Sequence, residues 1–248
     1  MFTKTHAKYI QSLHDKKLRT EYGVFFAEGP KVVSDLLQGG IFTCTMLAAT
    51  DNWLQTNLPW IATMPIGEVF AIKDFELEKI SALSQPNQVL AVFEQQQPQA
   101  DFDTKGQLTI LLDGLQDPGN LGTILRTADW FGVANMVCTP HCADIYNPKV
   151  VQGTMGSLGR VNVLYTEAMP WLQQQQGVPI YATALTGKHL RQYSPITEGI
   201  IMVGNESKGV SPALLQMAHH TIHIPGKGAA ESLNAAVALG IVLAQLSL

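Results

Sequence analysis

Cysteine is scarce in this sequence, and no apolar run is long enough to span a membrane. The 248 residues include three cysteines: Cys44, Cys138 and Cys142. An odd number cannot all pair within the chain, so a disulfide framework is excluded and a reducing compartment is favoured. The most apolar stretch, 233–248, is too short for a bilayer span and is interrupted by Asn234 and Gln245. Residues 1–20 also lack the features of a secretory signal, so we expect a cytoplasmic protein with no membrane partner.

Charged residues are also few, and the negative net charge is unfavourable for binding nucleic acid. Charged residues make up 15% of the chain and the net charge is −4, whereas neutralising phosphates requires Lys and Arg. Segment 4–19 is an exception, because it has a single acid, Asp15. Its basic residues are Lys4, Lys8, Lys16, Lys17 and Arg19. We therefore expect a small basic surface at this end of the chain to compensate for the acidic total.

Apolar segments of strand length alternate with segments of helix length in the second half of the chain. The expected strands are 108–112, 136–138, 161–165, 180–184 and 200–203. Such alternation predicts an α/β fold, with a mostly parallel sheet and helices on both faces. A glutamine-rich segment without periodicity, 96–106, is predicted to be a linker. The expected domains are therefore residues 1–95 and residues 107–248.

The first domain is predicted to be a small α/β unit. Its expected elements, in chain order, are a polar helix over 4–19, a strand at 24–27, a helix stopped by Gly39 and Gly40, a strand at 43–49, a helix over 75–83 and a strand at 89–93.

Three separated segments place glycines and polar side chains where a strand gives way to a helix. They are 120–132, 203–209 and 224–234. This is the edge at which open α/β sheets bind ligands. Asn120 stands at an expected N-cap, and Arg126 follows on the same helix, where its guanidinium can grip a phosphate or a ribose. Glu206 is expected at the carboxyl end of a strand, where it can orient Arg126 or cap a helix. For an isolated Arg or Glu, the plain alternative is a solvated surface residue.

Two familiar kinds of site are not supported. The glycine-rich stretch 224–228 matches neither the Walker phosphate loop nor G-x-G-x-x-G, so neither an NTPase nor an ordinary dinucleotide site is predicted. Its backbone groups still suit an adenosyl cofactor. Cys138, His141 and Cys142 are three possible zinc ligands within five residues, but no fourth ligand is in view, and we predict no metal site.

At the three segments the chain resembles the SpoU (TrmH) family of RNA ribose 2′-O-methyltransferases, in the SPOUT superfamily. The family pattern N-x-G-x-x-x-R-T-A-x-x-F-G is similar to 120–132, G-x-E-x-x-G to 204–209, and I-P-x-x-G-x-x-x-S-L-N to 224–234. The resemblance covers 108–248, and residues 22–37 more loosely resemble the start of the family's RNA substrate-binding domain. It implies a deep trefoil knot, RNA as substrate, and a homodimer with the active site near the subunit interface.

The resemblance also implies the functional residues and the cofactor. The catalytic group would be Arg126, Asn120, Glu206, Ser232 and Asn234. Backbone groups of three residues would hold S-adenosylmethionine: Gly204, Ile224 and Leu233. Since the pKa of arginine is above about 12, Arg126 is expected to orient the ribose hydroxyl and stabilise negative charge rather than act as a base.

Two alternatives to this enzyme stay open. A noncatalytic RNA-binding or ribosome-assembly factor on the same fold would keep the motifs for structural reasons, although the intact set of five polar residues favours catalysis. A small-molecule enzyme with a nucleotide cofactor is disfavoured by the missing phosphate loop. Among RNA substrates, the additional N-terminal domain favours ribosomal RNA over transfer RNA.

Overall fold

The computed structural model describes residues 1–247 and divides the chain into two compact units. The first unit combines Met1–Gln97 with Asp144–Gly159, and the second combines Pro98–Ala143 with Arg160–Leu248. The chain therefore passes between the units three times, after Gln97, Ala143 and Gly159. The domain limits expected from the sequence stay a prediction, and they do not include the return of 144–159 to the first unit.

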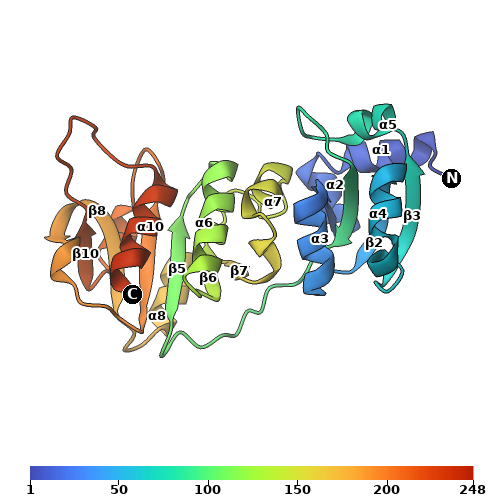
Figure 1. The fold of residues 1–248 in the computed structure, drawn as a ribbon. Helices are drawn as coiled ribbons and strands as arrows, with labels where there is room; N and C mark the ends of the chain where they lie inside the picture. The colour runs from blue at the N-terminus through green and yellow to red at the C-terminus, as the bar shows by residue number, and fades with distance from the viewer. Residues whose placement is uncertain (248) are drawn as a thin grey trace. The chain divides into compact units, whose positions relative to one another are not determined.

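The first unit contains a four-stranded mixed sheet in the order β1-β4-β2-β3 (Figure 1). The strands are β1 (Val24–Glu28), β2 (Cys44–Thr50), β3 (Ile66–Ile72) and β4 (Val89–Glu94). Strand β4 is antiparallel to both neighbours, and β2 is parallel to β3. Strand β3 was not expected from the sequence, because this edge strand exposes Gly67, Glu68 and Val69 and so lacks an apolar run.

Seven helical segments belong to the first unit: α1 (Lys4–Ser12), α2 (Lys16–Tyr22), α3 (Pro30–Gly39), α4 (Asp51–Ile61), α5 (Asp74–Ile80), α7 (Pro148–Thr154) and the short 3-10 helix η1 (Ser157–Gly159). The prediction of one helix over 4–19 was wrong. The chain breaks after Ser12, and the Asp15 carboxylate then caps α2 by accepting a hydrogen bond from the Lys17 amide at 2.7 Å.

Arg19 does not belong to the expected basic surface. Its side chain is only 2% exposed, and its guanidinium donates to Asp144 Oδ2 at 2.7 Å. It also donates to the carbonyl oxygens of Leu13 and His14, at 2.9 and 3.0 Å. Arg19 therefore ties the end of α1 to the returning segment 144–159, while the four lysines of segment 4–19 are exposed.

The second unit confirms the predicted parallel sheet. Its six strands are all parallel and lie in the order β10-β8-β9-β5-β6-β7. They are β5 (Leu108–Asp113), β6 (Asn135–Cys138), β7 (Asn162–Tyr165), β8 (Ile180–His189), β9 (Gly199–Gly204) and β10 (His220–His223). Because all six run in one direction, their carboxyl ends meet at a single edge of the sheet.

Helices cover both faces of this sheet, as predicted. On one face, Leu111 and Met202 pack with Trp171 of α8 (Ala168–Gln174) and Leu214 of α9 (Pro212–Leu215). On the other, α6 (Pro118–Trp130) packs beside α10 (Ala235–Leu246), and a short 3-10 helix, η2 (Leu190–Gln192), contacts α10 (Figure 1). No helix within residues 1–247 is both long and apolar enough to cross a bilayer. The deep knot implied by the resemblance stays a prediction.

Helix α6 begins earlier than the sequence suggested, and α10 begins after Asn234. Asp117 caps α6, and its Oδ1 accepts from the Asn120 amide at 2.7 Å, so Asn120 lies in the first turn and is not the N-cap. Proline is favoured at the first helical position, and Pro118 sets this earlier start. Helix α10 is capped by Asn234, whose Oδ1 accepts from the Ala236 and Val237 amides, so Ser232 precedes the helix.

Candidate active site

Loops from neighbouring strands meet at the carboxyl edge of the six-stranded sheet. Strands β5 and β9 are adjacent, with Asp113 paired to Gly204 in register, so the segments after them adjoin. Two of the hydrogen bonds between these segments lie close to the strand ends. Asn205 Nδ2 donates to the Gly114 carbonyl at 2.8 Å, and the Ser211 amide donates to Asp113 Oδ2 at 2.7 Å. The second and first motif segments are thus held together.

Asn120 links all three motif segments through its side-chain amide. Its Nδ2 donates to Glu206 Oε1 at 3.0 Å, and its Oδ1 accepts from Asn234 Nδ2 at 2.7 Å. The same Glu206 oxygen accepts from the Asp117 amide at 3.3 Å. A carboxylate can only accept, so the Asn120 NH₂ group must face Glu206 and its oxygen must face Asn234. The network therefore has one consistent orientation.

Gly204 ends β9 where the following loop folds back on it. A Cβ atom at this position would lie 1.9 Å from Gly209 C and 2.0 Å from Val210 N, so only glycine fits. Asn205 and Gly209 exchange two backbone hydrogen bonds, of 3.0 and 2.8 Å, and close the turn. This tight turn leaves Glu206 exposed on the side that faces Asn120.

Two of the predicted catalytic residues lie outside the hydrogen-bond network. Arg126 is exposed on α6, six residues after Asn120, and no hydrogen bond or ion pair joins its guanidinium to any of residues 1–247. Ser232 is likewise exposed, and its hydroxyl has no partner among those residues. The structure thus brings together Asn120, Glu206 and Asn234, but it leaves Arg126 and Ser232 apart.

The third motif segment offers an irregular, solvent-facing backbone. Residues 224–234 form neither helix nor strand, and all of them except the half-buried Ile224 are exposed. Leu233 exposes 48% of its surface. Uncharged N–H and C=O groups beside an apolar side chain suit an adenosyl group that carries no phosphate, so these residues fit S-adenosylmethionine.

A fourth segment lies at the same edge and was not identified from the sequence. Strand β8 pairs with β9 only through Ile180–Ala182, and its pairing with β10 jumps from Ala182 to Lys188. Residues 183–187 are therefore paired with neither neighbouring strand, and Leu185 is 70% exposed. Gly187 has φ +144°, and a Cβ atom there would lie 2.5 Å from the Thr221 carbonyl oxygen. The Thr186-Gly187 pair was the available signal in the sequence.

The possible zinc ligands after β6 do not converge. Cys138 and Cys142 are buried, whereas His141 is exposed. The neighbouring Cys138 thiol lowers the pKa of Cys142 to about 6, and Thr139 supports this shift. Thr139 Oγ1 also accepts from the Gly114 amide at 2.8 Å, which ties this loop to the end of β5. Within residues 1–247 no group of three or more His, Cys, Asp or Glu side chains is placed to hold a metal ion.

The parallel sheet and the polar network at its carboxyl edge define a protein of the SPOUT fold class. The model of the SpoU rRNA Methylase family matches residues 107–244, and that of the MRM3-like substrate binding domain matches residues 4–91. The chain belongs to the SpoU rRNA methylase family.

Relatives extend over almost the whole chain. The 23S rRNA (guanosine(2553)-2′-O)-methyltransferase RlmP of Bacillus subtilis (strain 168) is 31% identical, over 95% of this chain and 93% of the relative. A putative RNA methyltransferase of the TrmH family from Porphyromonas gingivalis has a solved structure that is 35% identical, with a TM-score of 0.85, over 99% and 98% of the two chains. An AdoMet-bound rRNA methyltransferase from Sinorhizobium meliloti is 30% identical, with a TM-score of 0.86, over 99% and 95%.

Proposed function

We propose that the protein transfers the methyl group of S-adenosylmethionine to a ribose 2′-hydroxyl of ribosomal RNA. The chain of hydrogen bonds from Asn234 through Asn120 to Glu206 carries this proposal, because it joins the three family motifs at the ligand-binding edge. The Bacillus relative, named as a 2′-O-methyltransferase of 23S rRNA, and the AdoMet-bound Sinorhizobium structure support the substrate and the cofactor. The unpaired cysteines fit the reducing cytoplasm, where we place the protein.

The chemistry requires the ribose hydroxyl to be held in line with the methyl group while its oxygen gains negative charge and its proton passes to solvent, to which the site is open. Bound S-adenosylmethionine supplies an electrophilic methyl group on a sulfonium. A guanidinium is a cation with hydrogen-bond donors and no acceptor, so the role of Arg126 is to orient the ribose oxygen and stabilise its charge. Glu206 carries the negative charge that orients this guanidinium, and Asn120 and Asn234 fix the direction of Glu206. Ser232 completes the polar group around the RNA.

Three backbone segments would hold the cofactor at this edge. We assign the main contacts to Gly204, Ile224 and Leu233, as the family motif implies. Segment 183–187, which is exposed from Leu185 to Gly187, lies at the end of the neighbouring strand and would form a further wall. These groups act by excluding water and fixing the methyl group, and positioning of this kind accounts for much of the acceleration in such transfers.

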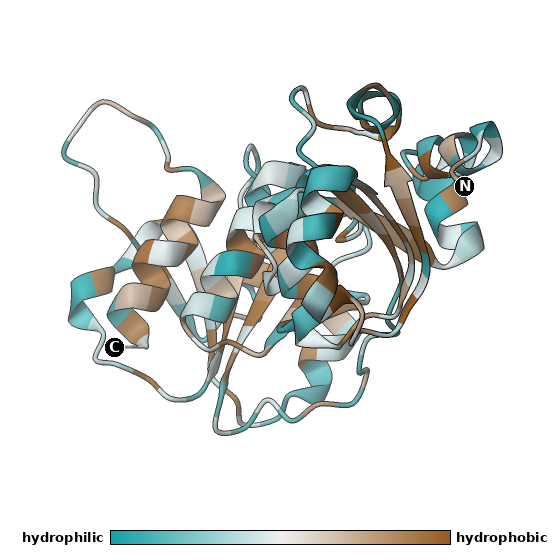
Figure 2. Ribbon diagram, turned by 45° about the vertical axis from the view of Figure 1, so that its right-hand side comes forward, coloured by the Kyte–Doolittle hydropathy of each residue, from teal (hydrophilic) through white to brown (hydrophobic). Residues whose placement is uncertain are grey.

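A second copy of the chain would cover an apolar surface on the helices beside the site. On α10, Val237 and Ile241 expose 51% and 38% of their surface one helical turn apart, and so share one side. Leu233, just before the helix, exposes 48%. Trp130 at the end of the adjacent α6 is 84% exposed. The residues of α10 itself are apolar around nearly the whole helix (Figure 2). Exposed apolar residues gathered in this way mark a protein interface, so the protein is proposed to be a homodimer.

The same dimer would complete the active site. Arg126 is one helical turn from Trp130 on the exposed side of α6, and it has no partner among residues 1–247. A second copy seated on α6 and α10 would place Arg126 of one protomer beside Glu206 of the other.

Mixed dimers test this arrangement. Arg126→Ala and Glu206→Gln proteins, each inactive alone, are unfolded, mixed in equal amounts and refolded together. If Arg126 acts on the other protomer's site, half of the dimers contain one complete site and the mixture regains about one quarter of wild-type activity. An inactive mixture that contains mixed dimers would place Arg126 and Glu206 in the same protomer's site.

The proposed reaction is tested with methyl-labelled S-adenosylmethionine and separate pools of ribosomal and transfer RNA, followed by nucleoside analysis. Label should appear in a 2′-O-methylnucleoside of ribosomal RNA and be absent with Arg126→Ala. Cofactor binding without transfer to any pool, assembling ribosomal particles included, would instead indicate a noncatalytic RNA-binding factor.

A further inference from the structure

The outer strand pair of the parallel sheet is locally basic in an acidic protein. Segments 180–193 and 219–223, which include β8 and β10, contain no Asp or Glu, although the chain as a whole has a net charge of −4. The basic residues of these segments are Lys188, Arg191, His189, His219, His220 and His223, and these include four of the chain's seven histidines. Strand β10 is an edge strand, so this positive charge lies at one end of the sheet (Figure 1).

Three rings and a lysine form a compact group on this edge. His220 stacks on Tyr181, with ring centroids 4.9 Å apart and an interplanar angle of 24°. Tyr193 meets both rings edge-on at centroid distances of 6.0 Å. Lys188 Nζ lies 4.6 Å from the centroid of the Tyr193 ring. We call Tyr181, Lys188, Arg191, Tyr193 and His220 the β10-edge cluster.

The cluster is anchored on one side and open on the other. Tyr181 is only 6% exposed, and the Tyr193 hydroxyl donates to the Thr221 carbonyl at 3.4 Å. In contrast Lys188, Arg191 and His220 are exposed. No ion pair joins Lys188 or Arg191 to a carboxylate of residues 1–247. Two cations are thus presented beside fixed rings with their charges uncompensated.

We propose that the β10-edge cluster binds a single-stranded stretch of RNA next to the methylated nucleotide. Lys188 and Arg191 would contact phosphates, and His220 would stack on a base. Aromatic platforms beside cations, with no acids between them, are the chemistry that binds single-stranded nucleic acid. The inference rests on the proposed function, and it places an RNA contact in the second unit, outside the residues matched by the substrate-binding family.

The position of the cluster along the chain supports the same occupant. His223 ends β10, and the next residue, Ile224, begins the proposed cofactor segment. Lys188 and His189 pair in register with Ile222 and His223. An RNA strand lying along β10 would therefore run toward the carboxyl edge, where the ribose must be presented.

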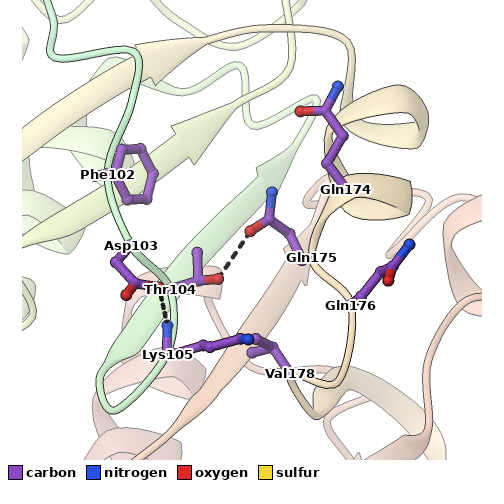
Figure 3. A pocket seen from close by; sticks show the side chains of 8 residues that line it. All are labelled: Phe102, Asp103, Thr104, Lys105, Gln174, Gln175, Gln176 and Val178. Atoms are coloured by element: carbon purple, nitrogen blue, oxygen red, sulfur yellow. Dashed lines mark hydrogen bonds between the residues drawn. The ribbon is translucent and has the colours of Figure 1, made fainter.

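RNA binding by variants tests the proposal without relying on catalysis. A fluorescently labelled fragment of 23S ribosomal RNA is titrated with wild type, with Lys188→Ala/Arg191→Ala, and with Lys105→Ala. Lys105 is the matched control, because it is a lysine of the same unit at the amino edge of the sheet (Figure 3). The double variant should bind about tenfold more weakly. The slope of log affinity against log salt should fall by about 1.4, or about 0.7 for each phosphate that is no longer neutralised.

His220→Ala separates stacking from charge. It should weaken RNA binding by about tenfold with an unchanged salt slope, because a stacked base contributes without releasing counterions. Cofactor affinity, measured by calorimetry, should be unchanged in all variants.

The proposal would be overturned if the double variant bound RNA with wild-type affinity and salt slope, or if Lys105→Ala weakened binding equally. It would also be overturned if the double variant changed its oligomeric state, because the cluster would then be an interface between copies. Wild-type RNA binding without methyl transfer would refute the proposed reaction and leave the cluster's role standing. Failure of the wild type to bind the fragment would overturn both.

Discussion

The two edges of the parallel sheet both carry polar side chains, but they are built differently. At the amino edge, residues 102–105 and 174–178 enclose a hollow of about 200 Å³, and Thr104 Oγ1 donates to Gln175 Oε1 at 2.8 Å (Figure 3). Other segments also join at this edge, because Asn162 Nδ2 donates to Asn135 Oδ1 at 3.1 Å and the Gly106 amide donates to Glu198 Oε2 at 2.6 Å. At the carboxyl edge, Asn120 joins three segments, and a fourth lies beside them. Polar contacts between separated segments are therefore common to both edges, and the carboxyl edge is distinguished by a network that joins the three family motifs.

The long-range contacts at both edges follow from strand direction. In a parallel sheet the segments that leave the strands all start from one edge, so residues far apart in the sequence meet there. Asn120 and Asn234 are 114 positions apart, yet their side chains are hydrogen-bonded at 2.7 Å. We expect substitutions at the carboxyl edge to affect methyl transfer and those at the amino edge to affect stability alone.

The expected difference between the two edges would be refuted most completely if methyl transfer did not require Arg126. Arg126→Ala should lower the rate of methyl transfer by on the order of 10³, because the ribose oxygen loses the cation that stabilises its charge. Arg126→Lys should restore little of this rate, since an ammonium cannot reproduce the bidentate geometry of a guanidinium. Single-turnover transfer to ribosomal RNA measures both. Near-normal turnover in the lysine variant would contradict a geometric role.

A charge placed inside the network should have the next largest effect. Asn120→Asp replaces the NH₂ group that faces Glu206 with a second carboxylate, and the repulsion should displace Glu206 and slow transfer by about 10²-fold. Asn52→Asp, an identical change at an exposed position of the first unit, serves as the control. Equal rates in the two variants would show that the network does not position the reacting groups.

A substitution at Gly204 tests the stability of the carboxyl edge rather than its chemistry. Gly204→Ala should lower the free energy of unfolding by about 2–3 kcal/mol, because the new methyl group overlaps the backbone of Gly209 and Val210. Gly226→Ala is the comparison, because a Cβ atom there meets nothing within 4 Å. Urea unfolding measures both. A Gly204→Ala protein as stable as the wild type would mean that the 205–209 turn is free to move away.

The smallest effect is expected at the amino edge. Thr104→Ala removes the hydrogen bond to Gln175 and should cost about 1 kcal/mol of stability. Its rate of methyl transfer at a temperature well below unfolding should equal that of the wild type. A folded Thr104→Ala protein with slow transfer would give the amino edge a part in function and remove the distinction between the edges.

The parallel sheet and the convergence of the motifs could be predicted from the sequence. Buried parallel strands appear as continuous apolar runs, such as 108–112 and 200–203, and parallel strands bring their carboxyl ends together. The placement of the three motif segments at this edge followed from this geometry, whereas the grouping of Asn120, Glu206 and Asn234 came from the family resemblance. The start of α6 was misplaced by three residues, although Asp117-Pro118 is a recognisable helix start.

Other features depend on tertiary contacts that no local pattern encodes. The 183–187 excursion arises from a shift of register between β8 and β10. The return of 144–159 to the first unit depends on Asp144 meeting Arg19, 125 residues away. The motif also gives no sign that Arg126 lies apart from the hydrogen-bond network. Its spacing places Arg126 on α6 but does not show on which side of the helix Arg126 lies.

The most direct test of the account is nucleoside analysis of ribosomal RNA from cells that lack this gene, with the wild-type gene or the Asn120→Asp variant restored. One 2′-O-methylnucleoside should be missing in the deletion strain, should return with the wild type, and should stay missing with the variant although the protein is made. A complete set of ribose methylations in the deletion strain would contradict the proposed reaction.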